Sequence, residues 1–480
     1  MLTTTLVVIA LCLVACSSST ASTAAPGATT ERATARQPSI VFILMDDMRA
    51  DAVDQLPELS ARTDLARFDR SYVELPQCCP ARATFLTGRY SSHTGVDTLI
   101  TGAELDDRTT LATMLRDGGY RTGLFGKYLN GFPFGRQEYV PPGWDEFHAY
   151  EGAVNYHDYR LNTNGPPVVY GSSPEDYSTD VLTGLAINFM RKTPDDEPFF
   201  AYIAYNAPHL DADGSVVPRE GDRGSCAAMP PLRLPSYDVR DTVGEPPWMA
   251  ALTPMGPLKQ ERNDTLVRDT CESLRSADAS ITSIFEELER QGRLEDTYVV
   301  FSSDNGFSWG EHRLCCKGHL YEESVRVPLL ARGPEVEPGE VHRLTSNIDL
   351  APTLLEWAGV TPPSDFVDGT SFAADLRGED GVPQPEAVLL RGCRSARPAA
   401  GSAVGDEGGG APCGGHFDDM PSNWGLRTDR HKYIEYPDGY VQLFDLEEDP
   451  YELHNLGLAP ETEALRAQLH EQLLELQSGS

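Results

Sequence analysis

Two short apolar runs lie far apart in the chain, and each ends in a pair of oxygen-bearing side chains. Residues 39–45 (SIVFILM) precede Asp46-Asp47, and residues 297–303 (TYVVFSS) precede Asp304-Asn305. The β-branched and aromatic residues of both runs predict buried strands of the kind found in parallel sheets. Because ligands bind at the carboxyl ends of strands in open α/β sheets, we expect both pairs to face a ligand.

From residue 39 to about residue 360 the sequence predicts an α/β fold with a large, mostly parallel sheet, because strand and helix signals alternate along it. Residues 110–118 predict a short helix that stops at a glycine. Residues 263–290 predict a long helix whose apolar stripe is interrupted only by Asp278. The proline-rich residues 211–260 predict an irregular insert that walls the substrate pocket.

The pattern of the sequence changes after Pro362-Pro363. Short alternating strands and a final amphipathic helix predict a small antiparallel sheet with a helix packed on it. The expected elements are strands at 424–427, 432–436 and 439–444 and a helix over about 461–477. We therefore expect a catalytic domain over residues 38–360 and a C-terminal subdomain over residues 361–480.

The polar residues after the two long strands are suited to a metal ion. Asp46, Asp47, Asp304 and Asn305 offer only hard oxygen ligands, which favour Ca²⁺ or Mg²⁺ and argue against zinc. Taken singly, each pair would more often be a turn or a helix cap.

A third segment, Cys78-Cys79-Pro80-Ala81-Arg82, has the pattern C-x-P-x-R and is followed by Thr87-Gly88. Adjacent cysteines before a proline are poor zinc ligands, because the cysteine pairs of zinc sites have about two to four residues between them. The segment resembles the signature of the type I, formylglycine-dependent sulfatases, and the resemblance runs from about residue 38 to residue 456. It implies a sulfuric ester hydrolase with an alkaline-phosphatase-like catalytic domain.

The resemblance also implies the cofactors of the site. In this family a formylglycine-generating enzyme oxidises the first cysteine of the signature, here Cys78, to formylglycine. One divalent cation, typically Ca²⁺ with Mg²⁺ as the alternative, would then lie between Asp46, Asp47, Cys78, Asp304 and Asn305.

Four basic residues complete the site that the resemblance implies. Arg82 lies one helical turn after Cys78 and can reach back toward the aldehyde and the metal. Lys127 in GKYLN, His209 in APH and Lys317 in KGH resemble the sulfate-binding and leaving-group residues of the family.

Other motifs resemble the N-acetylglucosamine-6-sulfatase and heparan-type branch. They are CCP, PPGW at 141–144, NIDLAPT at 347–353, and GKYLN, in which Leu129 stands where many sulfatases have a histidine. This branch lacks that histidine, and it implies a sulfated sugar, in particular a 6-O-sulfated amino sugar, as substrate; aryl sulfates are a further substrate class.

The resemblance implies the following reaction. The metal and Arg82 polarise the hydrated aldehyde, one hydroxyl attacks sulfur, and Lys317 or His209 protonates the leaving alcohol. The second hydroxyl then eliminates sulfate. The alternatives are a phosphate mono- or diester hydrolase of the same superfamily and a non-catalytic protein that binds sulfated glycans.

The charge of the chain limits its partners. Its 73 acidic and 39 basic residues give a net charge of −34. Such a surface argues against nucleic acid and against the binding of long polyanions. We therefore expect a small or terminal sulfated saccharide, held by a local basic pocket.

The N-terminal residues carry export signals. The apolar residues 6–15 are too few to span a bilayer. Leu13-Val14-Ala15-Cys16 resembles a bacterial lipobox, so residues 1–15 would be a lipoprotein signal peptide and residues 16–37 a flexible tether. We expect an exported protein that is held at the bacterial cell envelope by lipid on Cys16 or, alternatively, is secreted.

Ten cysteines fit an oxidising compartment. Cleavage removes Cys12, lipidation uses Cys16 and oxidation uses Cys78, so seven of the ten remain and at least one is unpaired. The expected disulfides are Cys393 with Cys413 and Cys226 with Cys271, and no partner is assigned to Cys79, Cys315 or Cys316.

Overall fold

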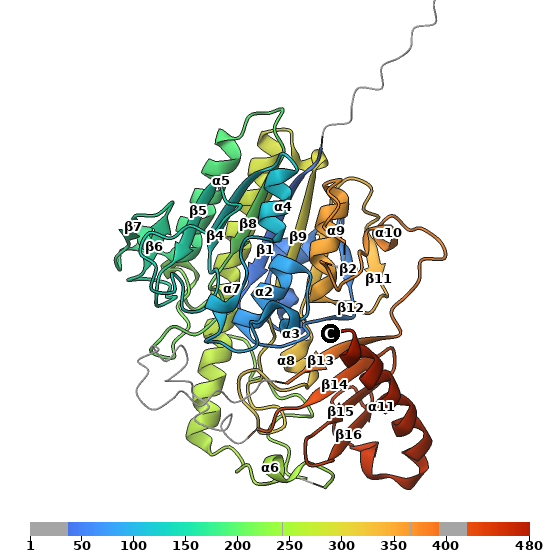
Figure 1. Cartoon of the computed structure of the whole chain (residues 1–480). Helices are drawn as coiled ribbons and strands as arrows, with labels where there is room; N and C mark the ends of the chain where they lie inside the picture. Colours follow the sequence, from blue (N-terminus) through green and yellow to red (C-terminus); the bar gives the residue numbers. More distant parts are fainter. Residues whose placement is uncertain (1–36, 242, 365, 393–419) are drawn as a thin grey trace, which may run out of the picture. The chain divides into compact units, whose positions relative to one another are not determined.

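The apolar run that begins at Ser39 forms a central strand, β1 (Ser39–Met45), of a ten-stranded sheet (Figure 1). The computed structural model describes residues 37–241, 243–364, 366–392 and 420–480. From one edge to the other, the strands are β11 (Gly339–Val341), β2 (Ala66–Phe68), β10 (Leu329–Arg332), β9 (Thr297–Ser303), β1, β8 (Phe199–Ala204), β4 (Arg121–Gly126), β5 (Glu146–Tyr150), β6 (Arg160–Thr163) and β7 (Pro167–Val169). Strands β9, β1, β8, β4 and β5 run parallel to one another. The predicted α/β fold with a mostly parallel sheet is confirmed.

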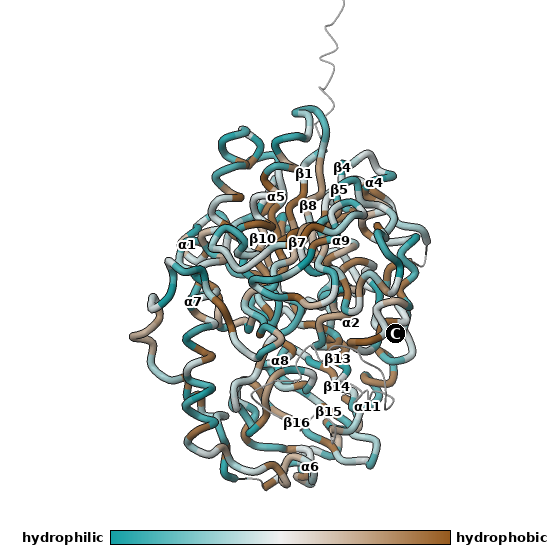
Figure 2. Tube along the Cα trace, turned by 90° about the vertical axis from the view of Figure 1, so that its left-hand side faces the viewer, coloured by the Kyte–Doolittle hydropathy of each residue, from teal (hydrophilic) through white to brown (hydrophobic). Residues whose placement is uncertain are grey.

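Successive residues of β1 enter two apolar cores on opposite faces of the sheet, as the alternation of a strand requires. Val41, Ile43 and Met45 pack with helices α5 (Ser178–Lys192) and α7 (Pro257–Arg290). Ile40 and its even-numbered neighbours pack with α2 (Cys78–Thr87), α4 (Leu111–Asp117) and α9 (Leu350–Trp357). Figure 2 shows the apolar colour of β1 and β8 between these helices. Helices on both faces keep the parallel strands out of water.

The long helix α7 begins at Pro257 rather than at Asn263, where the apolar pattern predicts its start. Before Asn263 the only large apolar residue of α7 is Leu258, which is exposed, so the apolar stripe does not extend to the start of the helix. A proline at the first helical position is well tolerated. Asp278, the one polar interruption of the stripe, accepts hydrogen bonds from the backbone N–H groups of Glu58 (2.8 Å) and Leu59 (3.0 Å). It therefore caps helix α1 (Pro57–Ala61), an interaction of about 1 kcal/mol.

The proline-rich insert of residues 211–260 is largely irregular. Its described residues include one short helix, α6 (Pro247–Ala250), a 3₁₀ turn and the first turn of α7. The expected disulfide between Cys226 and Cys271 is confirmed and ties the insert to α7. That the insert walls a substrate pocket stays a prediction.

A separate antiparallel sheet follows the large sheet in the chain, as predicted. Its strands are β13 (Ala387–Arg391), β14 (Trp424–Thr428), β15 (His431–Glu435) and β16 (Val441–Asp445). One face packs on helix α11 (Glu463–Ser478), and the other packs against Leu320 and Tyr321. Strand β16 begins later than residue 439 because Gly439 has a φ of 84° and forms the preceding turn.

The remaining elements are short. They are the helices α3 (Ser91–Thr94), α8 (Glu322–Val325) and α10 (Ala373–Leu376) and the two-stranded ladder of β3 (Ser71–Tyr72) and β12 (Thr345–Ser346). Residues 37–480 form one compact unit, and the expected domain boundary at residue 360 stays a prediction. In the described part of the chain, we find no helix with the length and apolar run needed to cross a bilayer.

Several expectations lie outside the described residues. They are the signal peptide of residues 1–15, the lipid site at Cys16, the tether up to residue 36, and the Cys393–Cys413 disulfide.

Candidate active site

The carboxyl ends of four neighbouring parallel strands meet at one edge of the large sheet. The strand register aligns Met45 of β1 with Ser303 of β9, and it aligns the ends of β1 and β4 with the end of β8. Asp46 follows β1, Asp304 follows β9 and Lys127 follows β4. The loop after β8 carries His209. The register therefore delivers side chains from four distant parts of the sequence to one place, as expected for an open α/β sheet.

Asp47 adopts a backbone conformation with a φ of 65°, which aspartate tolerates better than most residues. Its backbone N–H donates to Asp304 Oδ1 (3.2 Å), and its Oδ1 accepts from Asn305 Nδ2 (2.6 Å). The turn lets the side chains of both Asp46 and Asp47 reach the site. The two acidic pairs that end β1 and β9 are thus in direct contact.

Cys78 is the first residue of helix α2, and it enters the site from the even-numbered face of β1. Its Sγ lies 3.3 Å from Asp46 Oδ1 and 2.7 Å from Lys317 Nζ. All ten residues of α2 are buried, which fixes the helix and its first residue. The helix N-terminus favours negative charge at this position.

Arg82 lies one turn further along α2 and is fully buried. Its Nε donates to Asp304 Oδ2 (2.8 Å), one terminal nitrogen donates to the backbone oxygen of Lys127 (2.8 Å), and the other lies 3.4 Å from Asp46 Oδ2. The guanidinium group therefore joins α2 to the ends of three strands. Its partners are the carboxylates and the backbone, so its role in this arrangement is to hold them in place.

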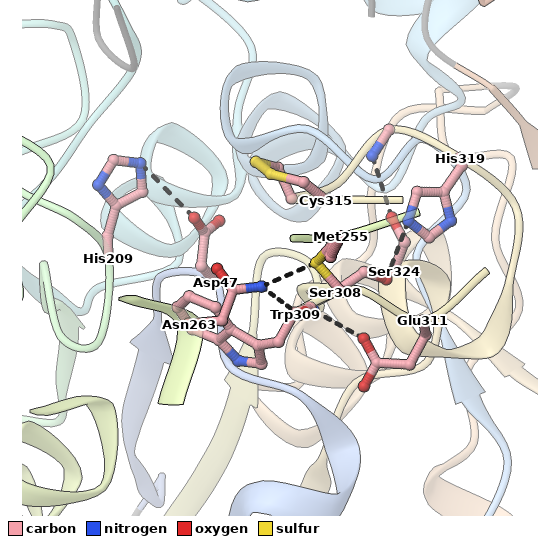
Figure 3. The surroundings of a disulfide bond; sticks show 12 residues. Asp47, His209, Met255, Asn263, Ser308, Trp309, Glu311, Cys315, His319 and Ser324 are labelled. Atoms are coloured by element: carbon pink, nitrogen blue, oxygen red, sulfur yellow. Dashed lines mark hydrogen bonds and ion pairs between the residues drawn. A yellow bond between two sulfur atoms is a disulfide. The ribbon is translucent and has the colours of Figure 1, made fainter. Parts of the chain in front are cut away.

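The other three basic residues contact the two aspartates after β1. Lys127 Nζ lies 2.8 Å from Asp46 Oδ2, Lys317 Nζ pairs with Asp47 Oδ1, and His209 Nε2 lies 3.6 Å from Asp47 Oδ2. His209 Nδ1 lies 2.5 Å from the carbonyl oxygen of Leu210, so Nδ1 carries a proton and Nε2 faces the site. Figure 3 shows His209 pointing toward Asp47.

The side chains of the site differ in how far they are exposed to solvent. The side chains of His209 and Lys317 are 14% and 13% exposed, whereas those of Lys127 and Asp46 are 3% and 0% exposed. Water and a substrate can therefore reach the cluster from the side of His209 and Lys317.

The buried charges shift one another's pKa values. Burial raises the pKa of Asp46, but four basic side chains, with Lys127 the strongest, outweigh this effect and hold the pKa well below its usual range. Burial and the neighbouring Asp46 raise the pKa of Asp304. Burial, followed by the charges of Asp304 and Asp46, raises the pKa of the Cys78 thiol well above its usual value. An unmodified thiol at this position stays protonated and is a weak nucleophile.

The donor set fits a hard divalent cation. Ligand atoms of Asp46, Asp47, Cys78 and His209 lie within 4.8 Å of one another, and Asp304 and Asn305 touch Asp47. Asn305 Oδ1 is buried and has no hydrogen-bond partner among the described residues. A buried polar oxygen without a partner is unfavourable, and a bound cation would satisfy it.

A second buried cluster brings potential ligand atoms of His312, Glu323 and Glu452 within 4.8 Å of one another. Lys432 Nζ of β15 lies 2.8 Å from Glu452 Oε1 and also 2.8 Å from Glu322 Oε1 of helix α8. Lys432 already supplies a counter-charge to Glu452, so this cluster is part of a buried ion-pair network that joins helix α8 to the C-terminal sheet.

The structure brings all the predicted site residues together, and it adds one feature that the sequence analysis missed. Cys315 and Cys316 form a disulfide between adjacent residues, directly before Lys317 (Figure 3). The only signal for it in the sequence is the pair of adjacent cysteines. Leu129, which replaces the usual histidine, is buried in the apolar core with α2 and contributes no proton-transfer group.

Comparisons with known proteins agree with this site. The sequence profile of the sulfatase family matches residues 38–360, and the profile described as N-sulphoglucosamine sulphohydrolase, C-terminal, matches residues 416–479. An N-acetylglucosamine-6-sulfatase from Capra hircus is 30% identical over 486 residues, which cover 93% of this chain and 84% of the relative.

Solved structures share the fold. A protein in complex with its substrate D-glucosamine-2-N,6-O-disulfate superposes with a TM-score of 0.72 at 22% identity, over 92% of this chain and 98% of that chain. The phosphonate monoester hydrolase of Agrobacterium radiobacter superposes with a TM-score of 0.71 at 22% identity, over 92% of this chain and 95% of that chain. At this identity the two structures establish the fold alone.

We predict that Ca²⁺ stabilises the folded protein. At a free concentration about 100 times its dissociation constant, a cation bound only to the folded state contributes about 2.7 kcal/mol. Calorimetry should show a higher unfolding temperature with Ca²⁺ that is reversed by a chelator, and titration calorimetry should give a single site.

Two variants sharpen this test. Asn305→Ala removes a neutral ligand and leaves no unpaired charge, so it should weaken the effect of Ca²⁺. Asp106→Asn, at an exposed ion pair with Arg108, should leave it unchanged. An equal response of Asn305→Ala and the wild type would exclude the proposed ligand set.

Proposed function

The chain belongs to the sulfatase family and is a sulfuric ester hydrolase, and we propose that it removes the 6-O-sulfate of a terminal sulfated amino sugar. The observation that carries this proposal is the position of Cys78, at the first turn of α2 and within 3.3 Å of Asp46 and Lys317. Three carboxylates and three buried or half-buried cations surround it.

We propose that Cys78 is oxidised to formylglycine by a formylglycine-generating enzyme and that one Ca²⁺ binds to Asp46, Asp47, Asp304, Asn305 and residue 78. The oxygen donor set and the unpartnered Asn305 Oδ1 support a hard cation. When present, the hydrated aldehyde supplies a hydroxyl nucleophile and the cation supplies a Lewis acid.

The side chains of this protein would bind and orient the sulfate group. The negative charge of a sulfate ester is spread over its oxygens, and Lys127, Lys317 and His209 offer nitrogen atoms in the cluster around residue 78. Arg82 holds Asp46 and Asp304 in place through contacts of 3.4 and 2.8 Å. It therefore fixes the carboxylates rather than the substrate.

His209 and Lys317 are the two groups suited to protonate the leaving alcohol. Both are partly exposed on the side where a substrate enters, whereas Lys127 is buried. His209 donates its Nδ1 proton to Leu210 O, so it can protonate the alcohol only through Nε2 and only as the doubly protonated imidazolium. The leaving oxygen of a sugar is a strong base, and proton donation to it contributes about 100-fold to 10,000-fold in rate.

The chemistry of the substrate follows from the relatives and from the charge of the chain. The relative from Capra hircus is named an N-acetylglucosamine-6-sulfatase, which supports a 6-O-sulfated amino sugar. The net charge of −34 repels long polyanions, while the basic side chains of the site together with the proposed divalent cation would attract a single sulfate group. A small or terminal saccharide satisfies both conditions.

We predict that the Cys78 peptide of active protein carries an aldehyde, detected by mass spectrometry after derivatisation. Cys78→Ala should lower sulfate release at least about a thousandfold, because it removes the nucleophile, and should keep the circular dichroism spectrum. Cys79→Ala, at the adjacent buried cysteine, is the matched control and should keep the aldehyde. Full activity with an unmodified Cys78 would contradict the mechanism, and binding of sulfated glycans without turnover would favour a non-catalytic protein.

We predict that kcat/KM is higher for 6-sulfated N-acetylglucosamine than for an intact heparin-like polymer. Long-range repulsion causes part of this difference, so raising the salt concentration should narrow it. The 3-sulfated isomer and a phosphate monoester serve as controls for position and for the anion. Faster release from internal sulfates of the polymer would overturn the terminal specificity, and faster phosphate release would favour a phosphate ester hydrolase.

We also propose that lipid on Cys16 holds the enzyme at the bacterial cell envelope. The lipobox-like Leu13-Val14-Ala15-Cys16 motivates this proposal. The full chain should fractionate with membranes and be released by Cys16→Ser. Recovery of the wild-type protein in the soluble fraction would instead support secretion.

A further inference from the structure

The backbone that leads into Lys317 is held in a closed loop. Ser308 and Cys316 exchange two backbone hydrogen bonds, of 2.6 and 2.8 Å, and thereby close the loop of residues 308–316. Cys316 has a φ of 70°, a conformation that few residues other than glycine adopt. The disulfide between Cys315 and Cys316 lies at the end of this loop, next to Lys317.

Hydrogen bonds also anchor the two residues that follow Lys317. The backbone N–H of Gly318 donates to Ser324 Oγ (3.0 Å), and His319 Nε2 lies 3.0 Å from Ser308 Oγ (Figure 3). Burial lowers the pKa of His319 to about 3, so the ring is neutral and acts as a fixed hydrogen-bond partner. Lys317 thus lies between two anchored segments, and its side chain reaches the active site.

A lysine needs such support because its side chain is long. Ordering it costs rotamer entropy, and a misplacement of about 1 Å at a reacting group can cost about 100-fold in rate. Lys317 Nζ must lie against both Asp47 and Cys78. A backbone that is fixed immediately before Lys317 reduces the number of positions that Nζ can take.

The disulfide is open to small molecules. Cys316 is 7% exposed, whereas Cys315 is only partly buried and packs at the margin of the apolar core with α5 and α7. A dithiol from the solvent can therefore attack Cys315 Sγ. The S–S bond then breaks, Cys316 leaves as a thiol, and the second reductant sulfur displaces Cys315, which leaves two protein thiols and an oxidised reductant.

We propose that the Cys315–Cys316 disulfide is a positioning element for Lys317 and that its two-electron reduction lowers the turnover of sulfate esters. This inference rests on the proposed function, because it assigns Lys317 to the bound sulfate ester. The disulfide itself does not touch the reacting atoms. It acts through the backbone of the next residue.

The first experiment compares the oxidised wild type with the same protein treated with dithiothreitol, and with Cys315→Ser/Cys316→Ser. Mass spectrometry counts the thiols formed. We expect kcat to fall at least about tenfold on reduction and in the double-serine variant, with a smaller change in KM, and to recover when the wild type is reoxidised. Thiols also add to aldehydes, so dithiothreitol could lower kcat without acting on the disulfide. The double-serine variant is therefore treated with dithiothreitol as well, and its kcat should not change.

A second control separates the two disulfides. Cys226→Ser/Cys271→Ser removes the disulfide between the insert and α7, so it should lose thermal stability but keep kcat and its response to dithiothreitol. If this variant loses kcat as the other one does, the effect is general destabilisation and the proposal is wrong.

The decisive readout is a mutant cycle with Lys317→Ala, measured on a sugar sulfate and on an aryl sulfate with an acidic phenol. The ratio of the kcat values for the two esters should change in the same direction in the double-serine variant as in Lys317→Ala. Removal of the disulfide should have no further effect in the Lys317→Ala background. Additive losses, or unchanged kcat in the double-serine variant, would overturn the positioning role. If the oxidised wild type releases sulfate from neither ester, the proposed function itself fails.

Discussion

Six charged side chains at one edge of the large sheet, five of them buried, determine how the surrounding loops are arranged. Asp46, Asp47 and Asp304 face Arg82, Lys127 and Lys317 in contacts of 3.4 Å or less. Removing one member of a buried ion pair costs about 3–5 kcal/mol, because the remaining charge loses its partner without regaining water. Each cation comes from a different part of the chain, so the network fixes helix α2, the end of β4 and the loop before α8 against β1 and β9.

The fold supplies this network through the strand register. The ends of β9, β1, β8 and β4 coincide, and the alternation of side chains along β1 gives each face its own core. Helix α2 belongs to the core on the even-numbered face, and its first residue, Cys78, is therefore held beside Asp46. The two cores and the site depend on the same register, since a shift of one residue would exchange the two faces and separate the acidic pairs.

The elements that the sequence predicts well are those with strong apolar patterns. Strands β1 and β9 match their expected ranges, and the acidic pairs that follow them meet because parallel strands end at the same edge. The sequence does not predict the start of α7, because the apolar stripe begins only after the first turn of the helix. It also does not predict β13, because the strands expected after Pro363 begin only at residue 424. The pairing of Cys315 with Cys316 could not be predicted, because it depends on the backbone of a loop that tertiary contacts with Ser308 and Ser324 define. The site residues follow from strand ends and motifs, whereas their different exposure follows only from packing.

That difference in exposure links the site to the charge of the whole molecule. A surface with a net charge of −34 repels anions at a distance, so an anionic group gains binding energy only where cations dominate locally. Among the described cations of the site, Lys317 is the one with a partly exposed side chain, and His209 lies beside it on Asp47. An isolated sulfate group can reach them, whereas a polymer brings further negative charges against the acidic surface. Under the proposed function, the position of Lys317 Nζ would affect both the entry of the sulfate group and its chemistry, and a loop closed by hydrogen bonds and a disulfide lies directly before this residue.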